Sequence, residues 1–561
     1  MLYSTTKSLV VLYLVLFLYP FSSADAQRDY EIFWVSFKDK KDSPYSIFHP
    51  QEYLSPRALE RRQKYGITID ETDLPISPSY VESVVTSGFH VQYKSKWLNG
   101  IAVVGKYEDA NAEELSSLDF VKSVRPIGFV RKVQKAPKGI GERDYKQNYK
   151  MRPYFYGNGN NQIKMLNGHY LHKIGFQGQG MHIAVTDGGF LGMPETPAFD
   201  SLYAHDRILS TRDFVEGDEY VYESSDHGRN VMATMASNLP FLLVGTSPYA
   251  SYHLLKTEDD KGEYVIEEYN WVAAVEYADS VGTDVINCSL GYYDFDDNDM
   301  DYAYRNLNGN TAPITIAADY AAQKGILVVT SAGNEGNGKW KHITAPADAD
   351  SVLTVGAVDR DMYYAKFSSL GFKNRDNVKP NVMARGHQAV VATPKKYDTK
   401  YSFGTSFSAP IMAGMAASLW QALPQLNNME IIALLEKFSN KREDPTTKLG
   451  FGVPDFFAAY KSISPTVIEL DKKSKTIRHN HILNDRVDII MEYVDVPEIT
   501  VQVFNAGGNI VYEKIDELRT RQDRRFWVHD IDGWSEQPSG VYHLYIKMGK
   551  ETKRVLLLKY S

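Results

Sequence analysis

The pattern of apolar and polar residues divides the chain into regions of different texture, and the first is a short mixed region at residues 30–130. It holds alternating runs typical of strands, such as YEIFWVSFKD, and segments of helical spacing with Ser, Pro and Gly at their ends. Their order, β-α-β-β-α-β, predicts a small α+β domain of the split βαβ type. Residues 134–161 are then basic and rich in Gly, Pro and Asn, which predicts an exposed linker.

Short apolar runs alternate with helical segments over the second region, from about residue 174 to 462. The runs are continuous, as expected for strands buried on both faces: MHIAVTD, YHLLKTE, DVINCSL, ILVVTSA and SVLTVGAV. We therefore predict a doubly wound, mostly parallel α/β sheet within residues 162–463. Sheets of this kind place their functional sites just beyond the carboxyl ends of the strands.

Strict alternation returns in the last region, residues 464–561. Two stretches, ITVQVFNAGGNIVYEKI and SGVYHLYIKMGKETKRVLLLKY, each predict a pair of strands joined by a turn that contains glycine. These hairpins indicate a small C-terminal β-sandwich.

The first 26 residues have the pattern of a signal peptide. Lys7 precedes the apolar run SLVVLYLVLFLYPF, and Ala24-Asp25-Ala26 forms a cleavage pattern before Gln27. An N-terminal membrane anchor is the alternative, but the apolar run is short for a comfortable membrane span. We expect the protein to be exported.

Composition narrows the class of protein further. The chain has 561 residues, too many for one ordinary core, and its 43% hydrophobic and 24% charged residues are typical of folded soluble proteins. The net charge is −8, without the excess of basic residues that nucleic-acid-binding proteins have, which argues against nucleic acid as the main partner. The single cysteine, Cys288, rules out an intrachain disulfide and lies in an apolar run, where we expect a buried small residue.

Four polar residues fall where the predicted sheet places a site. Asp187 ends a strand, Asn334 follows another, and His227 and Ser406 each begin a helical segment. Each one alone has an ordinary structural explanation, as a turn residue, a structural histidine or a helix cap. Together they are an orienting carboxylate, an amide donor, a base and a nucleophile, which are the parts that an acyl-transfer site needs.

The local sequences resemble those of subtilases. The order Asp, His, Ser along the chain is that of subtilisin, and the stretches IAVTDGG, HGRNV, SAGNEG and GTSFSAP are similar to the family's motifs across residues 178–449. The resemblance implies that Ser406 is the nucleophile, His227 the general base and then acid, and Asp187 its orienting carboxylate. It also implies an oxyanion hole formed by the Asn334 side chain and the backbone N–H of Ser406.

The same resemblance implies a peptide-binding cleft and no required cofactor. Six residues match the segments that line the family's cleft, where the substrate is held as an added strand: Ser289, Leu290, Gly291, Ser331, Ala332 and Gly333. Subtilases often bind structural calcium. The acidic stretch DFDDNDMD at residues 294–301 offers carboxylates, but it lacks the glycine of an EF-hand loop at Asp299, and we favour a solvated acidic loop.

The sequence departs from the family's usual motifs near two catalytic positions. Gly188 stands where subtilases commonly have Ser or Thr, and Arg229 and Asn230 stand where they commonly have Thr and His. Neither change removes a catalytic atom. Arg229 brings a bulky charge near the base, which could alter its pKa or the shape of the cleft.

The flanking regions fit the same family. Residues 27–133 resemble an inhibitor propeptide, which implies a zymogen whose cleft is blocked until the chain is cut, and we expect the cut within residues 134–161. The C-terminal region resembles the sorting domain that directs bacterial cargo through the type nine secretion machinery. The resemblance is weaker there, because generic β-sandwiches share this texture.

The sequence therefore predicts a secreted serine endopeptidase that acts on proteins or peptides and carries its own inhibitor. Two alternatives stay open at this point. One is a catalytically inactive subtilase fold that serves as a surface binding module, and the other is an esterase-type acyl hydrolase.

Overall fold

The structure is a computed structural model. It describes residues 30–41, 43–106, 112–130, 156–373, 377–395, 398–464, 467–470, 488–491, 498–517, 524–527, 537–538, 540–548 and 551–559. The predicted signal peptide and most of the predicted linker lie outside the described residues. Among the helices of the described residues, none combines the length and the apolar character that a membrane crossing requires.

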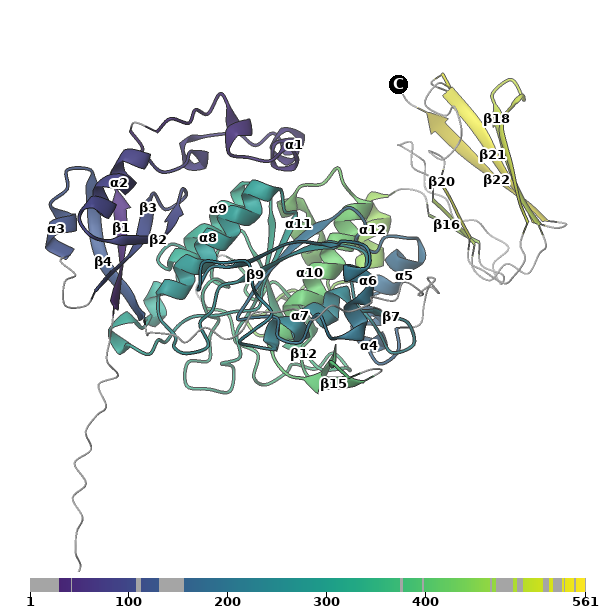
Figure 1. Ribbon diagram of the computed structural model, residues 1–561. Coiled ribbons are helices and arrows are strands. Elements are labelled where there is room, and N and C mark those ends of the chain that lie inside the picture. Colours follow the sequence, from purple (N-terminus) through teal and green to yellow (C-terminus); the bar gives the residue numbers. More distant parts are fainter. Residues whose placement is uncertain are drawn as a thin grey trace, which may run out of the picture.

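The N-terminal domain is a four-stranded antiparallel sheet with helices, in the strand order β2-β3-β1-β4 (Figure 1). Its apolar side chains, among them Val35, Val84 and Ile101, form a small core of their own. The elements are β1 (Tyr30–Phe37), α1 (Pro56–Tyr65), α2 (Pro78–Thr86), β2 (His90–Ser95), β3 (Gly100–Lys106), α3 (Ala112–Ser116) and β4 (Val121–Val130).

The residues at the two ends of α1 determine where the helix begins and ends, as the sequence predicts. The Oγ of Ser55 accepts a hydrogen bond from the N–H of Ala58, Pro56 occupies the first turn, and Gly66 ends the helix with φ 65°.

A seven-stranded sheet forms the centre of the second domain, in the order β13-β12-β11-β10-β5-β9-β6, and every neighbouring pair is parallel. The strands are β5 (His182–Asp187), β6 (Ile208–Asp213), β9 (Ser251–Lys256), β10 (Val285–Cys288), β11 (Leu327–Ser331), β12 (Leu353–Val358) and β13 (Val382–Arg385). The chain passes from β5 to the edge strand β6, returns to β9 beside β5, and continues with β10 to β13 on the other side of β5, so the switch in strand order, where such sheets bind ligands, lies beside β5.

Helices cover both faces of this sheet, which confirms the doubly wound prediction. Successive residues of a strand point to opposite faces of the sheet. Val185 packs in the core that includes α7 and α10, and Ala184 packs in the core that includes α8 and α9. Cys288 is buried in the second core, as predicted. The longer helices are α7 (His227–Ala236), α8 (Ile266–Val281), α9 (Pro313–Gln323), α10 (Thr405–Ala422), α11 (Asn428–Lys437) and α12 (Phe456–Ile463).

Shorter elements complete this domain. They are α4 (Asn160–Lys164), α5 (Gly168–Lys173), α6 (Asp200–Tyr203), β7 (Asn238–Leu239), β8 (Leu243–Val244), β14 (Ala389–Ala392) and β15 (Thr399–Ser402). The hairpin of β14 and β15 leads directly into α10.

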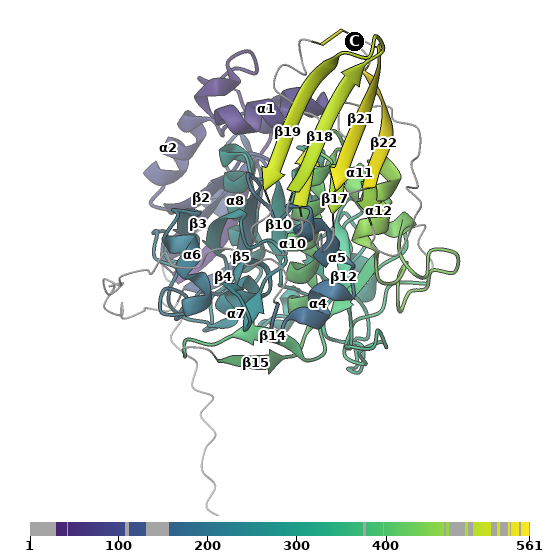
Figure 2. The same cartoon turned by 90° about the vertical axis from the view of Figure 1, so that its right-hand side faces the viewer.

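The C-terminal region consists of strands in two sheets, in the orders β16-β17-β20 and β19-β18-β21-β22. Figure 2 shows the two long hairpins of the second sheet side by side, where the sequence predicts them. The strands are β16 (Val467–Leu470), β17 (Asp488–Met491), β18 (Glu498–Asn505), β19 (Ile510–Glu517), β20 (Arg524–Trp527), β21 (Gly540–Met548) and β22 (Glu551–Lys559).

Candidate active site

Asp187 and His227 form a hydrogen-bonded pair at the carboxyl edge of the sheet. Asp187 is the last residue of β5, with a side chain that is 1% exposed, and His227 is the first residue of α7. The Nδ1 of His227 lies 2.9 and 3.0 Å from the two carboxylate oxygens of Asp187. Because a carboxylate oxygen accepts the hydrogen bond, Nδ1 is the donor of this pair, and Nε2 keeps a lone pair in the neutral imidazole.

Glycines allow the two segments to approach each other closely. The N–H of Gly228 donates to the carbonyl of Gly189 at 3.0 Å, so the first turn of α7 rests on the turn after Asp187. Gly189 has φ 142°, and a Cβ there would lie 2.2 Å from the carbonyl oxygen of Glu223. The Gly188-Gly189 pair therefore gives the turn that sets the distance between aspartate and histidine.

The surroundings of His227 favour its protonated form. Burial lowers its pKa, but the charge of Asp187 and its hydrogen bond, together with the charges of Asp226 and Glu258, raise the pKa above the usual value. The side chain is still 35% exposed, so one side of the ring is open to a substrate.

Arg229 is held away from free solvent by neighbours of the opposite charge. Its Nη2 lies 2.5 Å from a carboxylate oxygen of Asp226, and its Nη1 donates to the carbonyl of Leu191 at 2.9 Å. Lys400 contacts the same carboxylate at 3.3 Å. The positive charge of Arg229 near His227 is thus balanced by Asp226. The hydrogen bond from Arg229 to Leu191 also holds the loop that follows β5.

Ser406 and Asn334 meet around Gly404. Ser406 is the second residue of α10, and a Cβ at Gly404 would lie 3.6 Å from the Asn334 Nδ2 and 3.7 Å from the Ser406 backbone nitrogen. The Oδ1 of Asn334, which would lie 3.7 Å from the same Cβ, accepts hydrogen bonds from the N–H and the Oγ1 of Thr405 at 2.9 and 3.1 Å. The amide of Asn334 and the backbone nitrogen of Ser406 therefore border one small volume at the N-terminus of α10.

The histidine lies next to this helix start. Its ring centroid is 5.7 Å from that of Phe407, the residue after Ser406. Among the described residues, the hydrogen bonds of the His227 ring go to Asp187, and none joins the ring to the Ser406 Oγ. Such bonds are often long in unliganded enzymes and shorten when substrate binds. The structure thus brings all four sequence-predicted residues to one edge of the sheet.

The two predicted cleft segments lie beside each other next to α10. The Oγ of Ser331 donates to the carbonyl of Leu290 at 3.0 Å, and the Oγ of Ser289 donates to the carbonyl of Ser406 at 2.9 Å. Gly291 is exposed, and a Cβ there would lie 2.2 Å from the Oγ1 of Thr344. Ala332 and Gly333 continue the second segment as β11 ends.

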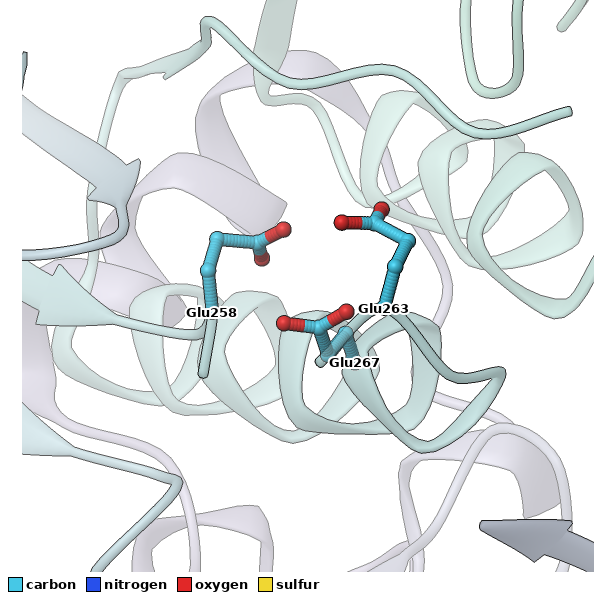
Figure 3. Close-up of side chains that lie close together, drawn as sticks. All are labelled: Glu258, Glu263 and Glu267. Carbon is cyan, nitrogen blue, oxygen red and sulfur yellow. The ribbon is translucent and has the colours of Figure 1, made fainter. Parts of the chain in front are cut away.

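Three glutamates form the cluster that could hold a metal ion among the described residues (Figure 3). The carboxylates of Glu258, Glu263 and Glu267 point toward one another, with one oxygen of each within 4.8 Å of the others. Burial, together with the charges of neighbouring carboxylates, raises their pKa to about 8, about 7 and about 11. Carboxylate oxygens suit calcium.

Hydrogen bonds already occupy much of this cluster. The two oxygens of Glu258 accept from the Thr257 and Tyr292 hydroxyls, and those of Glu267 accept from the N–H groups of Asp259 and Tyr264. The acidic stretch at residues 294–301, the candidate from the sequence, contributes no member. The signal in the sequence is the run EDDKGEYVIEE after β9, whose acidic residues meet only because α8 turns back on the strand.

Comparisons with known proteins agree with this geometry. The model of the subtilase family matches residues 178–453, and that of the peptidase S8 propeptide domain of Bacteroidota matches residues 32–142. Subtilisin DY of Bacillus licheniformis is 32% identical over 247 residues, which cover 44% of this chain and 78% of that protein.

Two further relatives complete the comparison. Subtilisin amylosacchariticus of Bacillus subtilis subsp. amylosacchariticus is 32% identical over 270 residues, and the match spans 47% of this chain and 62% of that protein's length. The fold is similar to that of fervidolysin from Fervidobacterium pennivorans, at 17% identity and a TM-score of 0.52, covering 96% of this chain and 77% of that one. The chain belongs to the subtilase family, with a propeptide domain of the Bacteroidota type in front of the family domain.

Proposed function

We propose that the protein is a secreted serine endopeptidase, made as a zymogen, that uses Asp187, His227 and Ser406 to hydrolyse peptide bonds. The observation that carries the proposal is the joint placement of the Asp187–His227 pair and the two donors around Gly404 at the start of α10. Family membership supports the same reaction class.

In the proposed mechanism the Oγ of Ser406 attacks the scissile carbonyl and gives its proton to the Nε2 of His227. Asp187 holds the opposite ring nitrogen and stabilises the imidazolium that forms. The oxyanion is bound by the Nδ2 of Asn334 and the backbone N–H of Ser406. His227 then protonates the leaving amine, and water hydrolyses the acyl-enzyme by the reverse sequence of proton transfers.

The proposed substrates are proteins and peptides. The segments 289–291 and 331–333 run side by side next to α10, and an extended peptide would bind between them by main-chain hydrogen bonds. The chemistry needs no metal ion or cofactor, since the base, the nucleophile and the oxyanion donors all come from the chain. The cluster of Glu258, Glu263 and Glu267 is the candidate for structural calcium.

The proposal extends to the segments around the catalytic domain. Residues 1–26 would direct export, residues 27–133 would inhibit the enzyme until a cut within residues 134–161, and residues 464–561 would engage a secretion machinery. If the cut is autocatalytic, the Ser406→Ala protein keeps the residues before about position 150, which N-terminal sequencing and intact mass will report. Normal processing of Ser406→Ala would mean that another protease makes the cut.

Hydrolysis of casein and of a small p-nitrophenyl ester separates the candidate functions. The wild-type protein is expected to cleave casein, Ser406→Ala to cleave neither substrate, and Ser402→Ala, a serine four residues earlier, to behave as wild type. Turnover of the ester without casein would favour the acyl hydrolase. Turnover of neither by correctly folded wild-type protein would favour the binding module.

A further inference from the structure

Helix α1 lies away from the sheet of its own domain and packs on the catalytic domain (Figure 1). It contacts the C-terminal ends of α8 and α9: the N–H of Ser55 donates to the carbonyl of Ser280, and a Cβ at Gly325 would lie 2.6 Å from the Cδ1 of Ile67. Strands β10 and β11 begin at this edge, whereas Asp187 lies at the opposite edge. The contact is therefore remote from the candidate active site.

Two arginines of α1 cap helices of the other domain. Gly282 is the C-cap residue of α8, and the Nε of Arg57 donates to the Gly282 carbonyl at 3.0 Å. Arg61 donates to the carbonyls of Thr283 and Lys324, at 2.5 and 3.1 Å, just past the ends of α8 and α9. The C-terminal end of a helix carries partial negative charge, so a guanidinium held beside it is stabilising.

Three cationic side chains of the N-terminal domain form ion pairs with one buried carboxylate of the catalytic domain. Asp279 is fully buried, and its oxygens lie 2.6 Å from the Arg61 Nη2, 2.8 Å from the Arg62 Nη2 and 3.2 Å from the Lys96 Nζ. Arg62 also contacts Asp73, at 3.0 Å. The contact between the two domains thus removes charged side chains of both domains from water.

At the C-terminal end of α9 the signs are reversed: the cation belongs to the catalytic domain and the carboxylates to the N-terminal domain. The Nζ of Lys324, at the end of α9, lies 2.9 Å from a carboxylate oxygen of Asp73 and 3.2 Å from one of Asp70. Arg57 lies 2.5 Å from Asp284, which precedes β10. The face of the catalytic domain that contacts α1 therefore carries negative charges at residues 279 and 284 and a positive charge at residue 324.

We propose that residues 55–73, here called the arginine hook, are a second anchor that holds the propeptide domain on the catalytic domain after the connecting chain is cut. The anchor acts independently of the substrate cleft, and the surface of Asp279, Asp284 and Lys324 is an exosite for this chain's own propeptide. This inference rests on the proposed zymogen. Removing one partner of a buried ion pair is strongly destabilising because the other charge stays buried without compensation, so the hook controls the dissociation rate.

The test uses the full chain with Ser406→Ala and with a recognition sequence for an unrelated site-specific protease inserted between residues 134 and 155. After the chain is cut, the catalytic part is immobilised through a C-terminal tag and the release of the N-terminal fragment is followed. The fragment is expected to stay bound. Combined Arg61→Ala and Arg62→Ala is expected to speed release about 100- to 1,000-fold, whereas Lys64→Ala, an exposed cation of the same helix, changes it less than threefold.

Release of the wild-type hook within the dead time of the assay, or equal release rates for the double variant and Lys64→Ala, would overturn the proposal. If the double variant does not fold, Asp279→Asn removes the shared partner from the other side and is expected to speed release about 100-fold. Equal release by folded Asp279→Asn and wild type would also overturn it. Because all these proteins carry Ser406→Ala, the outcome is independent of whether the wild type is a protease.

Discussion

Replacing Asp187 with asparagine changes one atom at the centre of the proposed mechanism. The N–H of Gly188 donates to Oδ1 of Asp187 at 2.9 Å, so the asparagine carbonyl oxygen takes that position and its NH2 group takes the Oδ2 position, 3.0 Å from His227 Nδ1. Two N–H donors repel each other, so the new NH2 group favours the imidazole tautomer with its proton on Nε2, in competition with the amide oxygen, which lies 2.9 Å from Nδ1 at the Oδ1 position. The nitrogen that should accept the Ser406 proton then has no lone pair.

The loss expected for this tautomer change is about 10⁴ in kcat, which corresponds to about 5 kcal/mol of transition-state stabilisation. A second signature is the acid limb of the pH profile of kcat/KM, which follows the pKa of His227. Since Asp187 is the largest influence that raises this pKa against the effect of burial, its removal lowers the pKa and moves the acid limb to lower pH.

Hydrolysis of a peptide anilide between pH 5 and 10 measures both signatures. Asp226→Asn is the matched control, because it removes another carboxylate close to His227, one with a side chain that is 45% exposed and that does not bind the ring. We expect this control to keep kcat within about tenfold and to shift the limb slightly. Retention of kcat within tenfold by Asp187→Asn, or an acid limb that stays in place, would refute the assigned role of Asp187.

Two further substitutions test the oxyanion site. Asn334→Ala is expected to lower kcat about 10²- to 10³-fold at nearly constant KM, the magnitude that the loss of one such donor has in subtilisin. Steady-state kinetics with a peptide anilide will show this, and a rise in KM with unchanged kcat would contradict the role. Gly404→Ala adds a Cβ between Asn334 and Ser406 at a residue with φ 143°, so we expect loss of activity together with a drop of about 1–3 kcal/mol in the free energy of unfolding, measured by denaturant titration. Wild-type stability and activity of this variant would contradict both the strain and the proposed location of the oxyanion.

Much of the fold could be predicted from the sequence because its signals are local. Continuous apolar runs predict strands buried on both faces, and all five of the runs singled out here are strands of the parallel sheet. The placement of Asp187 and Asn334 at the same edge of the sheet is predictable because the carboxyl ends of parallel strands share one edge. His227 and Ser406 follow from their positions at helix starts, combined with the order of the residues along the chain.

Features that depend on distant pairs could not be predicted. The ends of α1 are encoded by Ser55 and Gly66, but its docking depends on Asp279, more than 200 residues away, and nothing near α1 indicates that partner. The glutamate cluster exists only because α8 folds back beside the end of β9.

Mapping the residue that reacts with a fluorophosphonate probe tests the central claim most directly. Such a probe modifies a serine hydroxyl that an adjacent base has activated. Digestion of the labelled, processed protein and mass spectrometry are expected to find the phosphonyl group on Ser406 alone, and no labelling of Ser406→Ala. Casein hydrolysis by protein that stays unmodified at Ser406, or a label on another serine, would contradict the account.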